Sequence, residues 1–453
     1  MFDLNAEIQR WTDRLRKTGA LANADIVELE SHLRDEVDSL KGRGLSEDEA
    51  YIIAVKRIGE SDQLSDEYTK VNDTPLWKQL AFRDTDEKRE RRLMMDVLFV
   101  GVLCLLAGTA AKLPELLGIP LVEGTLEDLN FYARNFSFFV LPFIAFFFIV
   151  RRGSDKATAI AVAAAFIISI VAINIFPSFA PHHTLVLSAI HLPILLWMVI
   201  GVAYGGQTWR QDKTRMDFVR YSGEAFIYGV LVLCGVLVLM FFTLQIFSEI
   251  KLDISRFYNS YVFVYLGVSV PIVAVYLVEA KKSIVENIAP ILAKIFNPLF
   301  LITMLSFLGA VMFLGKNPYA DREFLLTFNL MLILVLGLVV YIVSARRGEE
   351  SVGVFDYLNL LLILVAVIID LIALSAIIFR ITSYGVSPNK ATVLGANLIL
   401  LVNLAGLMYH YARFVFGGRD FRIMEHWQTF YFYAYALWTA VVAFVFPAVF
   451  GFK

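Results

Sequence analysis

The residues most able to do chemistry in this chain are polar side chains inside long apolar segments. Asp370 lies deep in the apolar segment 355–379, and Asp356 and Asn359 lie near the start of the same segment. Fourteen positions separate the two aspartates. At 100° per residue they lie within about 40° of each other on a helix. Carboxylates at such depths carry protons and cations in pumps and transporters. The sequence therefore predicts one polar face that could conduct a proton or a cation.

A structural role explains the same residues. A charged side chain at the centre of a bilayer costs about 2.5–3.5 kcal/mol on insertion scales, so it must face a cavity or a partner. Asn397, Asn403 and Tyr409 on the following apolar segment are the candidate partners, because amides and hydroxyls hydrogen-bond between membrane helices. Asn397 and Asn403 therefore belong either to a polar path through Asp370 or to a hydrogen-bonded clamp around it.

Catalytic signatures are absent from the sequence. It contains no His-Glu-x-x-His, no phosphate-binding Gly-x-x-x-x-Gly-Lys-Ser/Thr and no Gly-x-Ser-x-Gly. Cys104 and Cys234 lie in apolar runs, without metal-ligand spacing. We expect no catalytic residues, no cofactor and no metal. One acidic connection, Glu115 to Asp128 with Glu123 and Glu127 between them, could support acid–base chemistry. A solvated amphipathic segment explains that connection more simply, so the sequence favours a protein that is not an enzyme.

The composition fixes the class of protein. Of 453 residues, 58% are hydrophobic and 18% are charged, against a usual charged fraction of about 25%. The mean hydropathy is +0.66. These values exclude a soluble enzyme, a disordered chain and a fibrous protein. Lys and Arg number 40 against 42 Asp and Glu, so no basic excess favours nucleic acid as a partner. The chain is predicted to be a polytopic membrane protein with the lipid bilayer as its environment.

Eleven apolar segments are long enough to cross a bilayer, which takes about 20 residues. They predict an all-α helical bundle in which residues 93–453 form the transmembrane domain. The segments are 93–112, 132–150, 157–176, 185–205, 222–247, 259–279, 297–315, 324–344, 355–379, 391–412 and 428–449. Pro142, Pro193 and Pro271 are expected to kink their helices, whereas Asn297-Pro298 is expected to start one. Ala391-x-x-x-Gly395 predicts close helix packing.

Charge in the connections predicts the orientation. The connections 151–156, 206–221, 280–296, 345–354 and 413–427 carry about 15 Lys and Arg residues, more than those on the opposite side. Because positive residues favour the cytoplasm, the N-terminus is predicted to be cytoplasmic. An odd number of spans would then place Lys453 outside.

Residues 1–71 are predicted to form a small cytoplasmic helical domain. Apolar residues at helical spacing mark one helix from about Asn5 to Lys17, and Asn23 can cap a second that ends near Gly42. Ser46 and Glu49 have the spacing of a capping box for a third helix, and Ser61 or Asp62 could cap a short fourth. Residues 72–92 are either an interfacial amphipathic helix or a solvated linker with a basic end.

This head resembles the permease-prefix (HAAS-type) domain, a helical module that precedes membrane domains in many bacterial proteins. The similarity covers about residues 3–70. It rests on Glu28-Leu29-Glu30-x-His32-Leu33, on Gly44-Leu45-Ser46-x-x-Glu49-Ala50 and on Arg57-Ile58-Gly59. An unrelated capped three-helix bundle is the alternative. The resemblance implies a regulatory head and a place in the bacterial cytoplasmic (inner) membrane.

The connection between the last two hairpins carries a second resemblance. Its residues run Arg380-Ile-Thr-Ser-Tyr384-Gly385-Val-Ser387-Pro-Asn-Lys390. They are similar to the Arg-Ile-x-x-Tyr-Gly-x-Thr-x-x-Arg signature of a bacterial multi-spanning family of unassigned function, with Ser and Lys in place of Thr and Arg. The similarity covers about residues 290–415, including Gly315–Arg322. It carries over no catalytic residue. A structural loop is the simpler interpretation, and the functional alternative is a gate or a ligand-binding loop.

Three functions remain open at this stage. The first is a transporter- or channel-like permease with a polar path around Asp370 and a regulatory head. The second is a sensor or assembly protein whose head recruits a cytoplasmic partner. The third is a membrane-embedded enzyme that uses the acidic outer connection. A cavity beside Asp370 would favour the first. A cytoplasmic protein and a second copy of the chain are the partners that the sequence leaves open.

Overall fold

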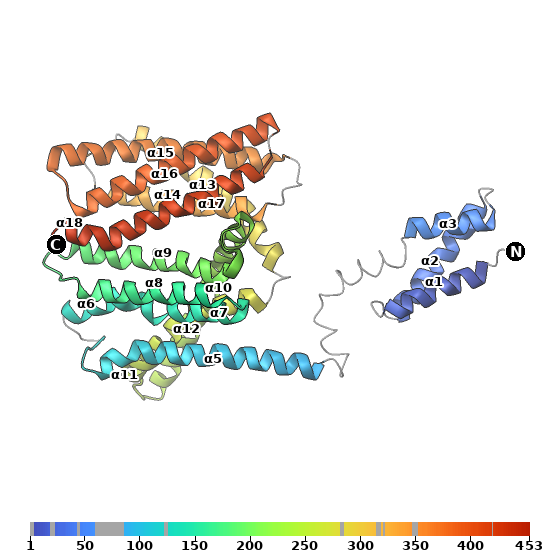
Figure 1. The fold of residues 1–453 in the computed structure, drawn as a ribbon, viewed down its shortest axis with the longest axis horizontal. Coiled ribbons are helices and arrows are strands. Elements are labelled where there is room, and N and C mark those ends of the chain that lie inside the picture. The colour runs from blue at the N-terminus through green and yellow to red at the C-terminus, as the bar shows by residue number, and fades with distance from the viewer. Residues whose placement is uncertain are drawn as a thin grey trace. The chain divides into compact units, whose positions relative to one another are not determined.

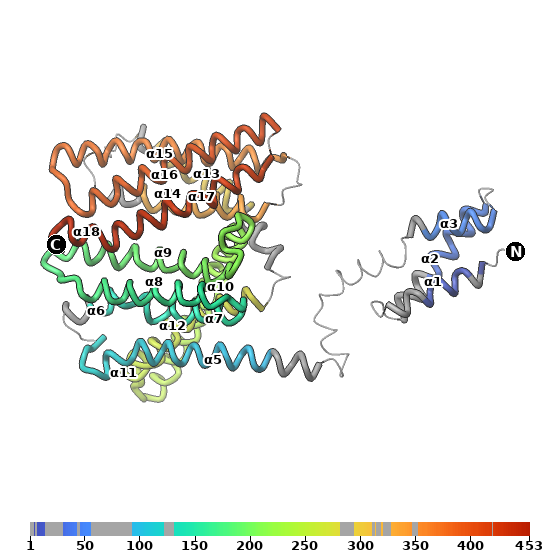
Figure 2. The backbone as a smooth tube through the Cα atoms, viewed as in Figure 1, coloured from blue at the N-terminus to red at the C-terminus, as the bar shows by residue number. Residues whose placement is uncertain are grey.

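The computed structural model describes residues 4–18, 23–42, 46–58, 86–121, 126–280, 285–313, 319, 322–346, 352–418 and 420–453. All regular elements within these ranges are helical. The chain divides into two compact units, Met1–Met94 and Met95–Lys453, and each is described by itself (Figures 1 and 2). This confirms an all-α fold.

The first unit is a small bundle of α1 (Leu4–Thr18), α2 (Asn23–Lys41) and α3 (Glu47–Ile58). Apolar residues of all three helices form its core, namely Ile8, Trp11, Leu33, Val37, Leu40, Ala50 and Ala54. Ser46 donates from its backbone N–H and its hydroxyl to the Glu49 carboxylate, at 3.1 and 2.8 Å. This contact confirms the predicted cap of the third helix. The predicted fourth helix and residues 72–85 lie outside the described residues.

The second unit contains the apolar helices. In chain order its elements are α5 (Asp86–Leu116), α6 (Leu126–Asn135), η2 (Phe136–Phe139), α7 (Leu141–Arg152), α8 (Lys156–Ile175), α9 (His183–Gly205), η3 (Gly206–Thr208), α10 (Asp212–Glu249), α11 (Ser255–Phe257), η4 (Tyr258–Val262), α12 (Phe263–Ala280), α13 (Val285–Phe313), α14 (Arg322–Ala345), α15 (Val354–Tyr384), α16 (Pro388–Gly417), α17 (Arg422–Ala440), η5 (Val441–Val445) and α18 (Phe446–Val449). Helices suit the hydrocarbon interior of a bilayer, because their backbone N–H and C=O groups form hydrogen bonds within the helix.

Ten of the eleven predicted spans correspond to helical segments that, within the described residues, are long and apolar enough to cross a membrane. The other, 297–315, falls on α13, where the described apolar stretch is the shorter Lys294–Gly309. Two proline predictions are corrected. Pro298 lies inside α13 and does not start it, because the helix begins at Val285. Pro142 occupies the first turn of α7, where a missing N–H costs nothing, and it begins that helix after the 3-10 turn η2.

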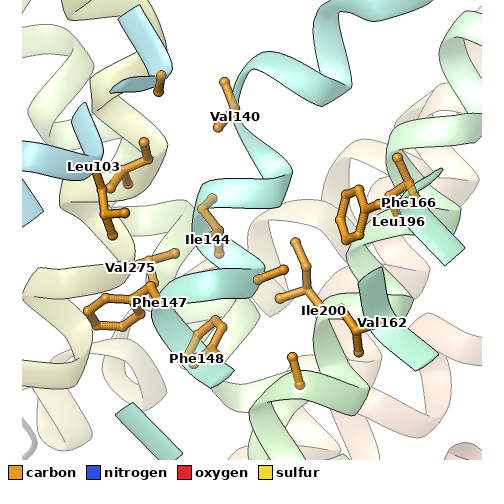
Figure 3. Packing of buried hydrophobic residues seen from close by; sticks show 14 of the residues in the cluster. Leu103, Val140, Ile144, Phe147, Phe148, Val162, Phe166, Leu196, Ile200 and Val275 are labelled. Carbon is orange, nitrogen blue, oxygen red and sulfur yellow. The ribbon is translucent and has the colours of Figure 1, made fainter. Parts of the chain in front are cut away.

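Two hydrophobic cores divide the second unit into halves. The amino-terminal half, α5–α9 with α12, packs around residues such as Ile144, Phe148 and Ile200 (Figure 3). The carboxy-terminal half, α13–α17, packs around its own core, which includes Phe328 and Leu404. α10 contacts helices of both halves, and α9 packs against α17. Figure 1 shows α9 lying between the two groups of helices.

One end of this bundle is rich in ion pairs, and we call it the charged end. Arg151 at the end of α7 binds Asp96 of α5 at 2.9 Å. The next residue, Arg152, binds Glu279 at the end of α12 at 2.9 Å. Arg220 near the start of α10 donates to the Ser344 carbonyl at the end of α14. The helices that begin or end here are therefore tied together by charge.

Glycine permits a close approach between α16 and α17 in the carboxy-terminal half. A Cβ atom at Gly395 of α16 would lie 2.0 Å from the Trp438 ring of α17. This contact explains why Gly395 is small, as the Ala391-x-x-x-Gly395 spacing predicts. Gly406, three turns further along α16, is covered in the same way by Trp427.

We predict that Gly395→Ala destabilises the protein by about 1–3 kcal/mol, because overpacking a tight contact forces shifts in the surrounding structure. Gly235→Ala is the matched control, since nothing lies within 4 Å of a Cβ at that helical position. Thermal unfolding in detergent measures both. Equal melting temperatures for the two variants would contradict the close α16–α17 packing.

Candidate functional site

The predicted polar face of α15 is buried along its whole length. Asp356 is 4% exposed, and Asn359 and Asp370 are 0% exposed. The sequence was therefore right that the three side chains face protein. Their surroundings differ, however, and this difference separates a structural group from a candidate functional one.

Asp356 belongs to an ion-pair cluster at the charged end. Its carboxylate accepts from the Gly353 N–H at 2.8 Å and from the Tyr411 hydroxyl at 2.8 Å, and it forms an ion pair with Arg346. The Arg346 guanidinium also lies over the Phe414 ring, 4.7 Å from its centroid. These contacts join α14, α15 and α16, so Asp356 serves as a lock between helices.

Asn359 lies one turn further along α15. Its amide is near the Tyr411 hydroxyl, but it makes no hydrogen bond within the described part of the chain. Along α15, Asn359 therefore lies between the ion-paired Asp356 and the deeper Asp370.

Asp370 has no such lock. Neither of its carboxylate oxygens has a hydrogen-bond partner among the described residues. The predicted clamp is not formed. Asn403 donates to the Tyr435 hydroxyl at 2.7 Å and accepts from Trp427 Nε1 at 3.0 Å. The Tyr409 hydroxyl accepts from Arg413 at 2.7 Å.

Asn397 does not complete the clamp either. Its Nδ2 has no hydrogen-bond partner within the described ranges. Asp370 and Asn403 do lie at the same depth. A three-residue turn joins α15 to α16, and Asp370 is 14 positions before the end of α15 while Asn403 is 15 positions after the start of α16. At 1.5 Å per residue, both lie roughly 21–23 Å from the turn. Asn403 itself is hydrogen-bonded to the Tyr435 hydroxyl of α17.

A large cavity lies between the two halves. Its volume is about 870 Å³, and residues of α9, α10, α13, α14 and α17 line it. Most of the lining is apolar. Gln428 and Tyr435 of α17 are among the polar residues that line it. Tyr435 therefore connects the cavity to the Asn403–Asp370 layer behind it.

Gln428 is the most unusual side chain in the cavity wall. It is 0% exposed, and neither its amide nitrogen nor its amide oxygen has a hydrogen-bond partner in the described structure. An unpaired buried amide typically costs about 1–3 kcal/mol. A fold that keeps Gln428 against an open space has a donor and an acceptor available there for a bound molecule.

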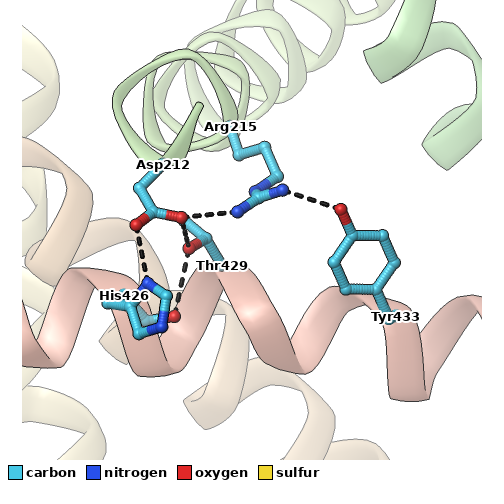
Figure 4. Close-up of polar contacts among 5 residues, drawn as sticks. All are labelled: Asp212, Arg215, His426, Thr429 and Tyr433. Carbon is cyan, nitrogen blue, oxygen red and sulfur yellow. Dashed lines mark hydrogen bonds and ion pairs between the residues drawn. The ribbon is translucent and has the colours of Figure 1, made fainter. Parts of the chain in front are cut away.

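A polar cluster adjoins the cavity through Arg215 and Tyr433, which both line it (Figure 4). Asp212 in the first turn of α10 accepts from Arg215 at 2.5 Å and from Thr429 at 2.8 Å, and it lies 2.7 Å from His426 Nδ1. Arg215, which lines the cavity, also donates to the Tyr433 hydroxyl at 2.8 Å. The cluster ties the start of α10 to the start of α17.

The loop motif has a structural role in this protein. Lys390 donates to the carbonyls of Arg380, Tyr384 and Gly385 at 3.3, 3.2 and 2.7 Å, so it caps the end of α15. Ser387 accepts from the Lys390 N–H at 3.4 Å and caps α16. Gly385 has φ = +74°, which glycine adopts readily. The side chain of Tyr384 is exposed. The motif thus builds a tight turn with both helix ends capped.

The remaining candidates lie elsewhere. Within the motif region 315–322, the structure describes only Tyr319 and the start of α14. The Tyr319 hydroxyl lies 3.2 Å from Ser375 Oγ. In the acidic connection, Glu115 is paired with Lys112 at 2.7 Å. Glu123 and the side chains of Glu127 and Asp128 are outside the described residues. No group of three His, Cys, Asp or Glu that could hold a metal occurs within the described ranges.

Sequence reasoning missed the cavity, its polar residues Gln428, Tyr435 and Arg215, and the neighbouring Asp212. The only sequence signal was a cluster of polar residues at the start of the last apolar segment, including His426, Gln428 and Thr429. Such a cluster is usual where a helix enters the membrane interface, so it does not by itself indicate a cavity.

Comparison with known proteins finds no relative: no family model, curated protein or solved structure matches the chain.

The difference between the two aspartates predicts that the same substitution destabilises the protein to different extents. Asp356→Asn should destabilise the protein by about 3–5 kcal/mol, because it leaves the buried Arg346 without its counter-charge. Asp370→Asn removes no hydrogen bond to a described residue, so its cost should be much smaller. Denaturant or thermal unfolding in detergent compares them. A larger loss for Asp370→Asn would show that Asp370 is the structural residue.

Capping by Lys390 predicts a smaller, local effect. Lys390→Met should cost about 1 kcal/mol through lost hydrogen bonds and lost interaction with the helix dipole. Lys390→Arg should retain most of the stability. Hydrogen exchange of residues 380–388 reports the end of α15 directly, and unchanged exchange in Lys390→Met would contradict the cap.

Proposed function

We propose that this integral membrane protein is a transporter- or channel-like permease of the bacterial inner membrane, with its N-terminal head in the cytoplasm. The observation that carries the proposal is the cavity of about 870 Å³ between two separately packed halves. Membrane transporters bind their substrates at such interfaces between halves.

The polar groups support a route from the cavity into the carboxy-terminal half. Tyr435 lines the cavity and is bonded to Asn403, and Asp370 lies at the depth of Asn403. A carboxylate without a protein partner inside a bilayer needs a proton or a cation to neutralise it. Asp370, Asn403 and Tyr435 would then form the coupling site, with Asn397 and Asn359 as further polar groups of the path. Asp356 would fix the helix that carries Asp370.

The N-terminal helical domain, residues 1–71, is proposed to regulate the permease. Its resemblance to permease-prefix domains and its own folded core, which includes Trp11 and Leu33, support a regulatory module. The Lys and Arg residues of the charged end favour a cytoplasmic location for the head.

A sensor or assembly protein is the second candidate. The independent core of the head favours it, because a folded domain can recruit a cytoplasmic protein. The cavity distinguishes the two, since a sensor does not need one. The membrane-embedded enzyme receives no comparable support, because Glu115 of the acidic connection is paired with Lys112.

Flux in proteoliposomes tests the permease. We expect proton or monovalent-cation flux above that of protein-free liposomes, and we expect Asp370→Asn to reduce it to that background. Glu249→Gln, an exposed acid at the far end of α10, is the control and should leave flux unchanged. Size exclusion checks that each variant is folded.

Two results would contradict the proposal. One is wild-type flux no greater than that of empty liposomes under every gradient tested. The other is equal flux in wild type and Asp370→Asn, which would remove Asp370 from the path.

A further inference from the structure

We propose that the cavity binds a membrane lipid with an anionic phosphate headgroup, with the headgroup at Gln428 and Arg215 and an acyl chain along the apolar walls. The inference rests on the proposed function, because it names the class of molecule that the permease would hold between its halves.

The size and the walls of the cavity suit an acyl chain. Its volume of about 870 Å³ lies within the range of roughly 300–1,000 Å³ that is usual for small-molecule sites. Apolar residues from both halves form most of the lining, among them Met198 of α9, Phe300 of α13 and Leu336 of α14. Such walls offer no hydrogen bonds, so a polar or highly charged solute would lose its hydration there without compensation.

The cavity is open toward the lipid. Phe226 of α10 is 71% exposed, and Ile333 and Leu334 of α14 are 55% and 47% exposed, yet all three line the cavity. In a membrane protein, exposed apolar side chains at this depth face hydrocarbon. A lipid chain could therefore enter sideways from the bilayer without crossing a polar barrier.

Two polar lining residues, Arg215 and Gln428, lie toward one end of the cavity. Arg215 lies in the first turn of α10 and Gln428 in the second turn of α17, and both helices begin at the charged end. The apolar lining residues of α10, such as Phe226, lie further along the helix. The polar end therefore lies near the membrane interface and the apolar part lies deeper, as in a lipid molecule in the bilayer.

The hydrogen-bonding groups at the polar end favour an acceptor-rich head. Gln428 Nε2 and Arg215 Nε are both buried donors without a partner in the described structure. Phosphate oxygens accept such bonds and pair well with guanidinium. The charges around this end are mixed, since Arg210, Lys213, Arg215 and Arg220 occur with Asp212 and Asp217, and Asp420 and Glu425 lie near the start of α17. The unpartnered donors, and not an excess of positive charge, therefore favour the phosphate. An anionic phosphate headgroup satisfies these donors.

Native mass spectrometry of the detergent-solubilised protein tests the proposal. The probes are palmitoyl-oleoyl phosphatidylglycerol and the phosphatidylcholine with the same chains. We expect the anionic lipid to be retained in preference to the zwitterionic one. Gln428→Leu should weaken its retention about tenfold, because one hydrogen bond to a charged group is lost.

Gly337 provides the sharpest variant. It lines the cavity, and nothing lies within 4 Å of a Cβ built there. Gly337→Leu should fill the cavity and abolish retention of the anionic lipid, with Gly337→Ala as a smaller step if the leucine variant does not fold. Gly235→Leu on α10 adds the same side chain at an open position outside the cavity lining and should leave binding unchanged.

The outcomes separate this inference from the permease. Equal retention of the two lipids, or anionic-lipid binding that survives Gly337→Leu, would overturn the lipid site even if Asp370-dependent flux is present. Selective binding that Gly337→Leu abolishes would support the site even if no flux occurs, and in that case only the permease proposal would fail.

Discussion

The structure of the membrane unit depends on the cost of leaving a polar group unpaired in a bilayer. Its deeply buried basic groups meet that cost with partners. Lys112 is bonded to Glu115 and to the Ser260 carbonyl and lies over the Tyr261 ring. Arg152 is paired with Glu279, and Arg346 is paired with Asp356. These pairs connect helices that are distant in sequence, so they set the helix arrangement at the ends of the bundle.

Asp370 and Gln428 are buried polar side chains without a hydrogen-bond partner among the described residues. Gln428 lines the cavity, and so does Tyr435, whose hydrogen-bond partner Asn403 lies at the depth of Asp370. Unsatisfied polar groups persist in a fold when they serve a bound molecule or a moving ion. The Asp212 cluster holds the start of α10 against the start of α17 beside the cavity, through the contacts of Asp212 with Thr429 and His426.

Much of the fold was readable from the sequence because it follows from periodicity and apolar length. The head core at Ile8, Trp11 and Leu33 and the cap at Ser46 needed only local patterns. The burial of Asp356 and Asp370 on one face of α15 followed from helical geometry. Whether each aspartate has a partner depends on Arg346 and Tyr411, on helices that the pattern of α15 does not specify. The prediction that Pro298 starts a helix was wrong, because the helical segment Val285–Phe313 continues on both sides of the proline. The cavity is a property of five helices together, and no single segment encodes it.

A structure determined by electron cryo-microscopy in nanodiscs that contain phosphatidylglycerol would test the central claim most directly. The claim is that the unpaired amide of Gln428 faces an open site between the halves. The account predicts lipid-like density in the cavity, with its head within hydrogen-bonding distance of Gln428 and Arg215. A cavity filled by protein side chains, with the Gln428 amide bonded to a neighbouring helix, would contradict it.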